Sequence, residues 1–419
     1  MPPGRNLFKS SHGKDWRMNA IGDATSIQTF DSPLAASSAA AQTIRRWLTA
    51  KALPLWSTEG FDHERGCFEE RLTRGGQPVL GTPRRAMVQA RQIYVFSHAA
   101  HLGWFPKGLQ IAETAMESLQ RDFRDGAEGF AFSVDADGKT VSLARDAYTH
   151  AFVLFAIAWL YRVNGDARLL QTADETTRFI ETSLVDPVYG GVFDEFPVKD
   201  RNKRQNPHMH LLEAFLALEE SAPGRGYIDR ARSLVEIFKV RLFSPDAGVL
   251  LEYFAEDWGA HPDTAKSCVW EPGHQYEWAW LLREYEKLTG EDLQFWIERL
   301  YLSARAYGSA ESLLLFDEVA TDMTVLKRSN RIWPHTEAAK AAVALYSAGD
   351  RKAPEFGAAM ISSLMEHFLD RPFEGGWIDH LDHRGHPLVD YVPASSLYHL
   401  FLAATEMNRA FPADAGGSA

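Results

Sequence analysis

The stretch that decides the fold is "AYTHAFVLFAIAWLY", residues 147–161, because its apolar side chains would point to all sides of a helix. A helix without a polar face is buried on most of its sides. The tripeptide "NGD", residues 164–166, combines a Gly that can end this helix with an Asp suited to begin another. Residues 169–184 then carry apolar side chains at i+3 and i+4 spacing, which is typical of an amphipathic helix. The sequence therefore predicts a buried helix paired with a half-exposed one.

A short motif precedes each such pair: a small or apolar residue, a bulky apolar residue, and then an acid. Its equivalent positions are Phe68, Ala131, Phe193, Leu250, Phe316 and Ile378. Adjacent copies are 57 to 66 residues apart, so the chain holds six units of nearly constant length. A linear stack of such units would need polar terminal caps, and no segment has that character. We expect a closed all-α (α/α)6 barrel of six inner and six outer helices, with short β-turn segments between repeats.

Composition sets the broader limits. We expect residues 36–411 to form this barrel as a single catalytic domain, and residues 1–35 to be a disordered tail. The net charge of −12 argues against a nucleic acid or an anionic membrane as partner. No apolar run reaches about 18 residues, so no membrane span is predicted. The two cysteines, Cys67 and Cys268, form no CxxC pair and are typical of a reducing compartment, which predicts a cytoplasmic protein.

The predicted inner helices place chemically active residues in their first two turns. Four of the six begin near a Pro, which favours the first turn of a helix. All six should therefore begin at one end of the barrel, around a common mouth. The residues expected there are Arg91, Tyr148, Asn206, His208, His210, Glu213, His274, Glu277, Trp333, His335, Glu337 and His399. Aromatic walls with converging polar groups suit an uncharged, ring-shaped ligand such as a sugar.

Two histidines are the candidates for proton transfer at this mouth. His274 and Glu277 share a helix face because they are three residues apart. His399 would approach from an opposite part of the ring, so two imidazoles could move protons at two positions of one substrate. His210 and Glu213 repeat the same spacing one unit earlier, whereas His208 is interpreted as a capping or packing residue.

Other residues have structural alternatives. Tyr148 and Trp333 are interpreted as pocket wall, and Glu213 and Glu337 could instead form ion pairs with Arg91 or Lys340. The segment "DHLDHRGHP", residues 379–387, resembles a metal-ligand cluster, but its Arg-Gly tip favours a solvated turn. No metal site is therefore predicted, and the chain holds no P-loop, GxGxxG, GxSxG or HExxH motif.

Six segments of the chain resemble, in order, the N-acylglucosamine 2-epimerase superfamily and within it the D-mannose isomerase branch. They are "VQARQIYVF", "DAYTHAFVLFA", "NPHMHLLEAFLAL", "EPGHQYEWAWLL", "RIWPHTEAAKA" and "SSLYHLFLA", and the resemblance extends over about residues 35–410. It implies an (α/α)6 barrel that interconverts an aldose and a ketose, here D-mannose and D-fructose, through a cis-enediol and without a cofactor.

The resemblance also implies roles for individual residues. His274 and His399 would be the acid and base, and Arg91 would stabilise an enediolate oxygen. Glu277 would orient the substrate or its neighbouring imidazole. Tyr148, Asn206, His210, Trp333 and Glu337 would bind the monosaccharide.

Three alternatives stay open from sequence. The first is a 2-epimerase of the N-acylglucosamine or cellobiose type. The second is a glycoside hydrolase or a polysaccharide lyase; hydrolysis would need two carboxylates across the sugar, Glu277 with Glu337 or Glu213. The third is a barrel that binds a sugar or another protein without catalysis, and the oligomeric state could be monomer or homodimer. An anionic sugar is disfavoured, because Ser395 and Ser396 replace a Gln of the relatives that bind such sugars.

Overall fold

The computed structural model describes residues 33–126 and 129–413. Residues 1–32 of the predicted tail lie outside these ranges, whereas residues 33–35 form the start of the first helix, α1 (Pro33–Trp47). Within the described ranges, no helix is long and apolar enough to cross a membrane. Cys67 and Cys268 are both free thiols, and the predicted cytoplasmic location stays a prediction.

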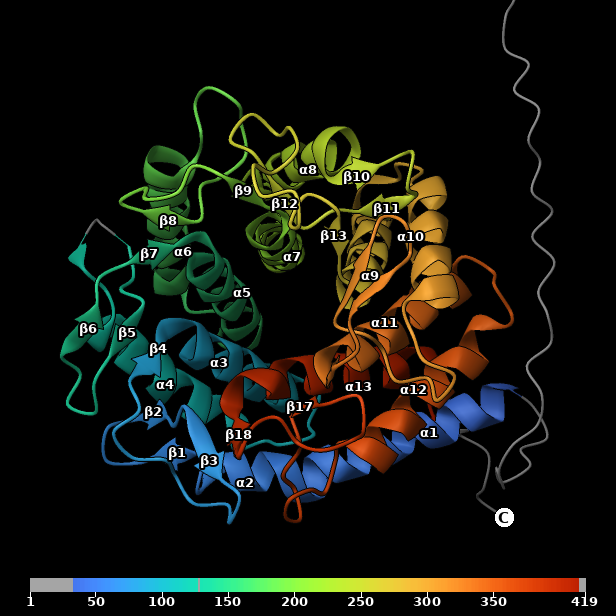
Figure 1. Cartoon of the computed structure of the whole chain (residues 1–419). Coiled ribbons are helices and arrows are strands. Elements are labelled where there is room, and N and C mark those ends of the chain that lie inside the picture. The colour runs from blue at the N-terminus through green and yellow to red at the C-terminus, as the bar shows by residue number, and fades with distance from the viewer. Residues whose placement is uncertain (1–32, 127–128, 414–419) are drawn as a thin grey trace, which may run out of the picture. The chain divides into compact units, whose positions relative to one another are not determined.

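Helices alternate between an inner and an outer ring, as the repeat predicts (Figure 1). In the described part of the chain, the inner ring consists of α3 (Ala86–His101), α5 (Ala147–Asn164), α7 (Gln205–Ser221), α9 (Pro272–Thr289), α11 (Trp333–Ser347) and α13 (Leu397–Ala410). The outer ring consists of α1, α4 (Gly108–Asp122), α6 (Ala167–Phe179), α8 (Tyr227–Ile237), α10 (Gln294–Tyr307) and α12 (Ala353–His367). The (α/α)6 barrel is thus confirmed.

Short turns extend several of these helices. They are the π-helical segments η1 (Leu48–Ala52), η3 (Ile180–Leu184) and η4 (Phe238–Leu242), the helix α2 (Leu53–Ser57) and the 3-10 turn η5 (Ala394–Ser396). Since η5 runs directly into α13, it supplies the first turn of the sixth inner helix.

The ring closes at a seam, the junction between α13 and α1. This junction departs from the predicted order, in which each inner helix is followed in sequence by its outer helix. The outer partner of α13 is α1, from the other end of the chain, which packs against both α12 and α13. Gln42 donates a hydrogen bond to the side chain of Asn408 at 3.1 Å, and Asn408 donates to the carbonyl of Ala41 at 2.8 Å. The repeat could not show this, because a ring of helix pairs can be closed by a helix from either end.

Short antiparallel strands link each unit to the next at the end of the barrel where the inner helices begin. They are β1 (Phe61–Asp62), β2 (Cys67–Phe68), β3 (Arg71–Thr73), β4 (Arg84–Arg85), β5 (Ser133–Val134), β6 (Thr140–Ser142), β7 (Arg145–Asp146), β8 (Glu195–Phe196), β9 (Lys203–Arg204), β10 (Phe243–Ser244), β11 (Val249–Leu250), β12 (Tyr253–Phe254), β13 (Val269–Trp270), β14 (Glu318–Ala320), β15 (Val325–Lys327), β16 (Asn330–Arg331), β17 (His380–Leu381) and β18 (Tyr391–Pro393). The strand before each inner helix pairs with a strand of the following unit, as in β4–β5, β7–β8 and β16–β17. Because β18 pairs with β3, the sixth unit is joined to the first.

Five inner helices carry a His or Gln at the same position, where it anchors the turn of its own unit. They are Gln89, His150, His208, Gln275 and His335, each accepting a hydrogen bond of 2.8 to 3.1 Å from a backbone N–H of that turn. Each imidazole also has Nδ1 within 3.1 Å of the carbonyl four residues earlier, to which it donates. Burial lowers the pKa of these three histidines to about 4, so they are neutral. The structural interpretation of His208 is confirmed, and His335 belongs to the same set.

Replacing His208 with leucine should therefore destabilise the barrel. The change leaves the buried N–H of Val192 and the carbonyl of Arg204 without their partner. We expect the free energy of unfolding to fall by about 2–4 kcal/mol, measured by urea denaturation. His383→Leu, at an exposed turn position, is the matched control and should change stability by less than about 0.5 kcal/mol. Equal effects of the two variants would contradict the anchoring role.

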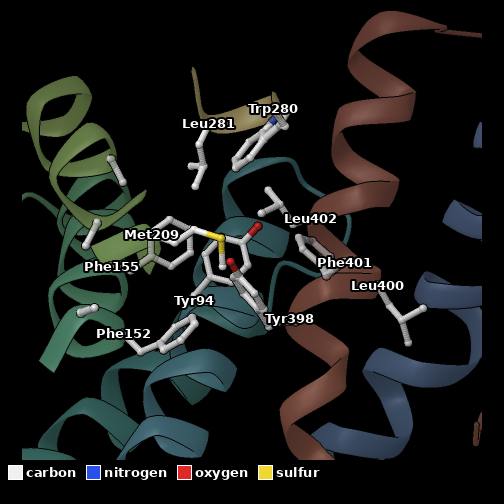
Figure 2. Close-up of a cluster of buried hydrophobic side chains, with 14 of the residues drawn as sticks. Tyr94, Phe152, Phe155, Met209, Trp280, Leu281, Tyr398, Leu400, Phe401 and Leu402 are labelled. Carbon is white, nitrogen blue, oxygen red and sulfur yellow. The ribbon is translucent and has the colours of Figure 1, made fainter. Parts of the chain in front are cut away.

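An aromatic cluster fills the middle of the inner ring (Figure 2). Tyr94 packs with ring centroids 4.6 Å from Phe155 and 5.5 Å from Tyr398, and Phe152 lies 5.2 Å from Tyr398. These rings come from α3, α5 and α13, so they hold three inner helices together. They also fill the centre of the barrel between its two ends.

Candidate active site

A ring of side chains lies near the start of the inner helices. Five of its members stand two residues beyond an anchoring His or Gln, and the sixth, His399, comes from α13, where Leu397 occupies the anchoring position. The members of the ring are Arg91, Phe152, His210, Glu277, Glu337 and His399, one from each inner helix. They contact one another in sequence around the barrel. The Arg91 guanidinium carbon lies 4.2 Å from the centre of the Phe152 ring, and that ring lies 4.6 Å from His210. His210 Nδ1 is 3.9 Å from Glu277, and polar atoms of Glu277, Glu337 and His399 lie within 4.8 Å of one another. The predicted convergence of the inner helices at one end is therefore present.

His399 is held by a carboxylate of the neighbouring helix. Its Nδ1 lies 2.8 Å from Glu337 Oε1 and donates to it, which leaves Nε2 as the atom able to accept a proton. The second oxygen of Glu337 forms an ion pair of 2.6 Å with Lys340. Burial, together with the positive charges of Arg91 and Lys340, keeps the pKa of His399 well below its ordinary value. His399 is thus a neutral imidazole, as a general base must be.

Glu337 thus contacts both His399 and Lys340. Both of its oxygens are engaged, one by His399 and the other by Lys340, and the side chain is fully buried. Glu337 Oε2 has no hydrogen-bond partner among the described residues besides this ion pair, so the predicted sugar contact of Glu337 stays a prediction. The alternative ion pair with Lys340 is the one present.

His274 has a different carboxylate partner from the one expected. Its Nδ1 lies 3.0 and 2.9 Å from the two oxygens of Glu252, and 3.8 Å from Glu271. Burial opposes the charged imidazole, but Glu252 and Glu271 more than offset it and raise the pKa of His274 to about 9. His274 is thus protonated at neutral pH and can donate a proton. The carboxylate in contact with this imidazole is that of Glu252, and an orienting role of Glu277 toward the substrate or a neighbouring imidazole stays a prediction.

Glu252 is the functional residue that the sequence interpretation missed. It is the acid of the recurring turn motif in the fourth unit, "GVLLE", residues 248–252. It is buried, and it also accepts hydrogen bonds from the side chain of Gln205 at 3.0 Å and the backbone N–H of Glu271 at 3.3 Å. The motif itself was the available signal, since it places an acid beside the start of the inner helix in several units.

The indole of Trp333 lies between the two candidate imidazoles. Its ring centroid is 4.9 Å from that of His274 and 5.6 Å from that of His399. The histidines come from α9 and α13, which flank α11, so they lie on one side of the ring and not on opposite parts of it. Gly273 permits this arrangement, because a Cβ there would lie 2.5 Å from the Trp333 ring.

Arg91 and Tyr148 form a second group beside His399. The Arg91 guanidinium donates to the Tyr148 hydroxyl at 2.5 Å and to the carbonyl of Ser395 at 3.1 Å, and it lies over the Tyr398 ring at 4.9 Å. These contacts fix its plane, and no carboxylate of the described residues pairs with it. Arg91 therefore keeps a net positive charge at the place where an oxyanion would need one.

Glu277 is a buried carboxyl group without a hydrogen-bond partner among the described residues. Burial and the neighbouring Glu337 raise the pKa of Glu277 well above its usual range. A neutral carboxylic acid can both donate to and accept from a sugar hydroxyl. This fits the predicted substrate-orienting role of Glu277.

His210 and Asn206 lie on the same helix, α7. His210 Nδ1 lies 3.0 Å from Glu213, and the His210 ring lies 4.8 Å from that of Tyr148. Burial lowers the pKa of His210 to about 4. The amide oxygen of Asn206 has no hydrogen-bond partner within the described ranges. Substrate contacts of both residues stay predictions.

Three groups of these side chains have the spacing that a metal ion accepts. They are His210–Glu213–Glu277, Glu252–Glu271–His274 and Glu277–Glu337–His399. In each group the imidazole Nδ1 faces a carboxylate, a contact that orients the ring and fixes which nitrogen is free. The carboxylates that a hydrolase would use, Glu213 and Glu337, are therefore engaged by imidazoles. The predicted turn at residues 379–387 is present, with His380 2.7 Å from Asp317.

A cavity of about 580 Å³ opens at the opposite end of the barrel, where the inner helices finish. Its lining includes Trp104, Trp159 and Trp280, and several of its charged residues pair with one another, as Arg409 does with Glu406 at 2.6 Å. Its imidazole, His98, is neutral because burial holds its pKa well below the ordinary value. The described residues of this end thus include no pair of imidazoles of which one is protonated and the other neutral. The end where the inner helices begin is therefore the better candidate for the active site.

Comparisons with known proteins agree with this geometry. Residues 66–403 match the family model for N-acylglucosamine 2-epimerase (GlcNAc 2-epimerase). A mannose-6-phosphate isomerase from Rhizobium meliloti is 32% identical, over 86% of this chain and 95% of the relative. A D-mannose isomerase from Thermobifida fusca is 26% identical, over 81% of this chain and 87% of the relative. The solved structure of a cellobiose 2-epimerase from Spirochaeta thermophila superposes with a TM-score of 0.79 at 26% identity, over 90% of this chain and 97% of that one.

Proposed function

Because the chain belongs to the N-acylglucosamine 2-epimerase family, whose members named above are sugar isomerases and epimerases, we propose that it interconverts D-mannose and D-fructose. The observation that supports this most is the pair of imidazoles around Trp333. One is held protonated and the other neutral, each by its own glutamate. An isomerase that works without a redox cofactor needs such an acid and such a base in one site.

The first step opens the pyranose ring. His274 gives its proton to the ring oxygen as the bond from that oxygen to C1 breaks, while the C1 hydroxyl loses its proton to solvent. His274 then recovers a proton from solvent, which its raised pKa of about 9 favours at neutral pH. Glu252 keeps Nδ1 occupied, so Nε2 is the atom that donates.

The second step moves a proton between carbons. His399 removes the proton from C2, the electron pair of that bond forms the C1–C2 double bond, and the carbonyl pair moves onto O1. Arg91 stabilises the resulting oxyanion. A proton then passes from O2 to O1, C2 becomes the carbonyl carbon, and His399 returns its proton to C1. The base is neutral again at the end, and no electron donor is consumed.

The arginines that precede the inner helices support an uncharged sugar over a sugar phosphate. Arg85 pairs with Glu70, and Arg204 lies 2.6 Å from Asp194. Arg331 lies 3.2 Å from Asp317 and 3.4 Å from Glu271. A phosphate carries about two negative charges and binds best to cations that are not already neutralised. We therefore propose free mannose, although one relative is named for mannose 6-phosphate.

The test is NMR of sugars incubated with the enzyme in deuterated water. We expect mannose to give fructose labelled with deuterium at C1, with kcat/KM at least about tenfold higher than for mannose 6-phosphate. Glucose as the main product would identify a 2-epimerase instead. Hydrolysis of a mannoside, or binding of mannose without exchange, would overturn the proposal.

A further inference from the structure

The two candidate imidazoles have nearly identical immediate surroundings. Each is 6% exposed, and each has Nδ1 within 3 Å of a buried glutamate, Glu252 for His274 and Glu337 for His399. A neighbouring carboxylate alone would favour protonation of both. The proposed reaction needs one protonated and one neutral imidazole at the same pH. The difference must therefore come from a third group beside each pair.

Beside His274 the third group is another carboxylate. Glu271 Oε2 lies 3.8 Å from His274 Nδ1, so this imidazole faces two carboxylates from the start of its own helix and the preceding turn. Arg331 offsets Glu271 only in part, at 3.4 Å. Burial raises the pKa of Glu271 to about 7, so its negative charge acts on His274 most fully on the alkaline side of neutral pH. The charged and titratable groups facing His274 are Glu252, Glu271, Glu277 and His210.

Beside His399 the additional charges are positive: the Arg91 guanidinium and, in contact with Glu337 itself, the Lys340 ammonium. Glu337 bridges His399 and Lys340, with Oε1 2.8 Å from His399 Nδ1 and Oε2 2.6 Å from Lys340 Nζ. The ammonium is fully buried, 4.0 Å from the centre of the Trp280 ring, which holds it in place. The charged and titratable groups facing His399 are Glu337, Lys340, Arg91, His210, Glu213, Glu277 and Tyr398.

We propose that Lys340 and Glu271 are the positioning residues that divide the two imidazoles into a base and an acid. The Lys340 ammonium neutralises Glu337, so that His399 stays unprotonated. The carboxylate of Glu271, the second one beside His274, keeps that imidazole charged. Neither residue needs to touch the sugar. This inference rests on the proposed function for its use, but the charges themselves can be measured without a substrate.

Lys340 is suited to this role because it keeps its charge. Burial opposes the ammonium, but Glu337, Glu277 and Glu213 more than offset it and raise the pKa of Lys340. Without it, the Glu337–His399 pair would face a surplus of negative charge. That pair would then retain a second proton up to a higher pH, and His399 could not act as the base in that range.

The experiment compares Lys340→Met with a matched control, Lys203→Met. Lys203 is also fully buried, lies 2.7 Å from Asp186 and lies 3.9 Å from the Phe193 ring, but it faces neither candidate imidazole. NMR titration of the imidazole carbons in the free enzyme, with His399→Asn to assign the signal, should show the His399 pKa raised by about one unit or more in Lys340→Met. Lys203→Met should leave it unchanged, and Lys340→Arg should restore it.

The pH dependence of kcat/KM gives a second test, in which the two variants are expected to shift opposite limbs of the profile. Lys340→Met should move the acid limb to higher pH, whereas Glu271→Gln should move the alkaline limb to lower pH, because it removes a charge that holds the proton on His274. Equal shifts in both lysine variants, or an unchanged alkaline limb in Glu271→Gln, would overturn the inference. If Lys340→Met does not fold, Glu271→Gln decides. If the NMR shifts occur but no sugar is isomerised, the proposed function is wrong and the division of charge stands.

Discussion

Replacing His399 with asparagine is expected to lower kcat for mannose by about 10²–10⁴-fold, the usual contribution of a general base. Asparagine keeps an amide that can donate to Glu337, but it has no nitrogen that can accept the C2 proton. Deuterium exchange at C2, followed by NMR in deuterated water, should disappear together with fructose formation.

Binding should survive this change. Mannitol, a linear hexitol that cannot react, serves as the probe, and its Kd measured by calorimetry should stay within about threefold of the wild-type value. Loss of both binding and catalysis would indicate that His399 shapes the site without acting as the base. Continued exchange at C2 would assign the base to another residue.

Arg91→Met is expected to lower kcat by about 10²–10³-fold, the typical cost of removing one oxyanion donor. Methionine fills much of the same space over Phe152 but has no charge. The effect should fall on kcat more than on KM, because the negative charge on O1 exists only along the reaction path. Steady-state kinetics with mannose give both constants.

Arg91→Lys is the matched variant for this prediction. Lysine retains the charge but cannot donate to Tyr148 and the Ser395 carbonyl in one plane, as Arg91 does. We expect an intermediate loss of kcat. An Arg91→Met enzyme that keeps more than about a tenth of the wild-type kcat would contradict the oxyanion role.

The barrel could be predicted from the sequence because the six-fold repeat of turn and helix pair is visible there. Six turn motifs at nearly constant spacing, each followed by a largely apolar helix, leave few arrangements that bury the inner helices. The helix that closes the seam could not be predicted. The apolar pattern of α1 shows an outer helix but not which inner helix it covers.

The sequence predicted which residues lie at the mouth of the barrel better than which of their side chains contact one another. His208 and His210, two residues apart, differ in their contacts because only His210 lies in the inward ring. Aligning Gln89, His150, His208, Gln275 and His335 separates the anchoring positions from that ring, two residues later. The partnership of His274 with Glu252 crosses 22 residues and depends on how the turn folds back, which helix spacing does not encode.

The seam at α1 has a consequence for biosynthesis. During translation α1 leaves the ribosome long before α12 and α13, yet its apolar face, with Ala41 and Ile44, is covered only when those helices arrive. The nascent chain must therefore shield this face for most of its synthesis, by transient contacts or by a chaperone. A circularly permuted gene that starts at α3 and joins the old ends through a linker before α1 would bring α1 out directly after α13, and should shorten that exposed interval.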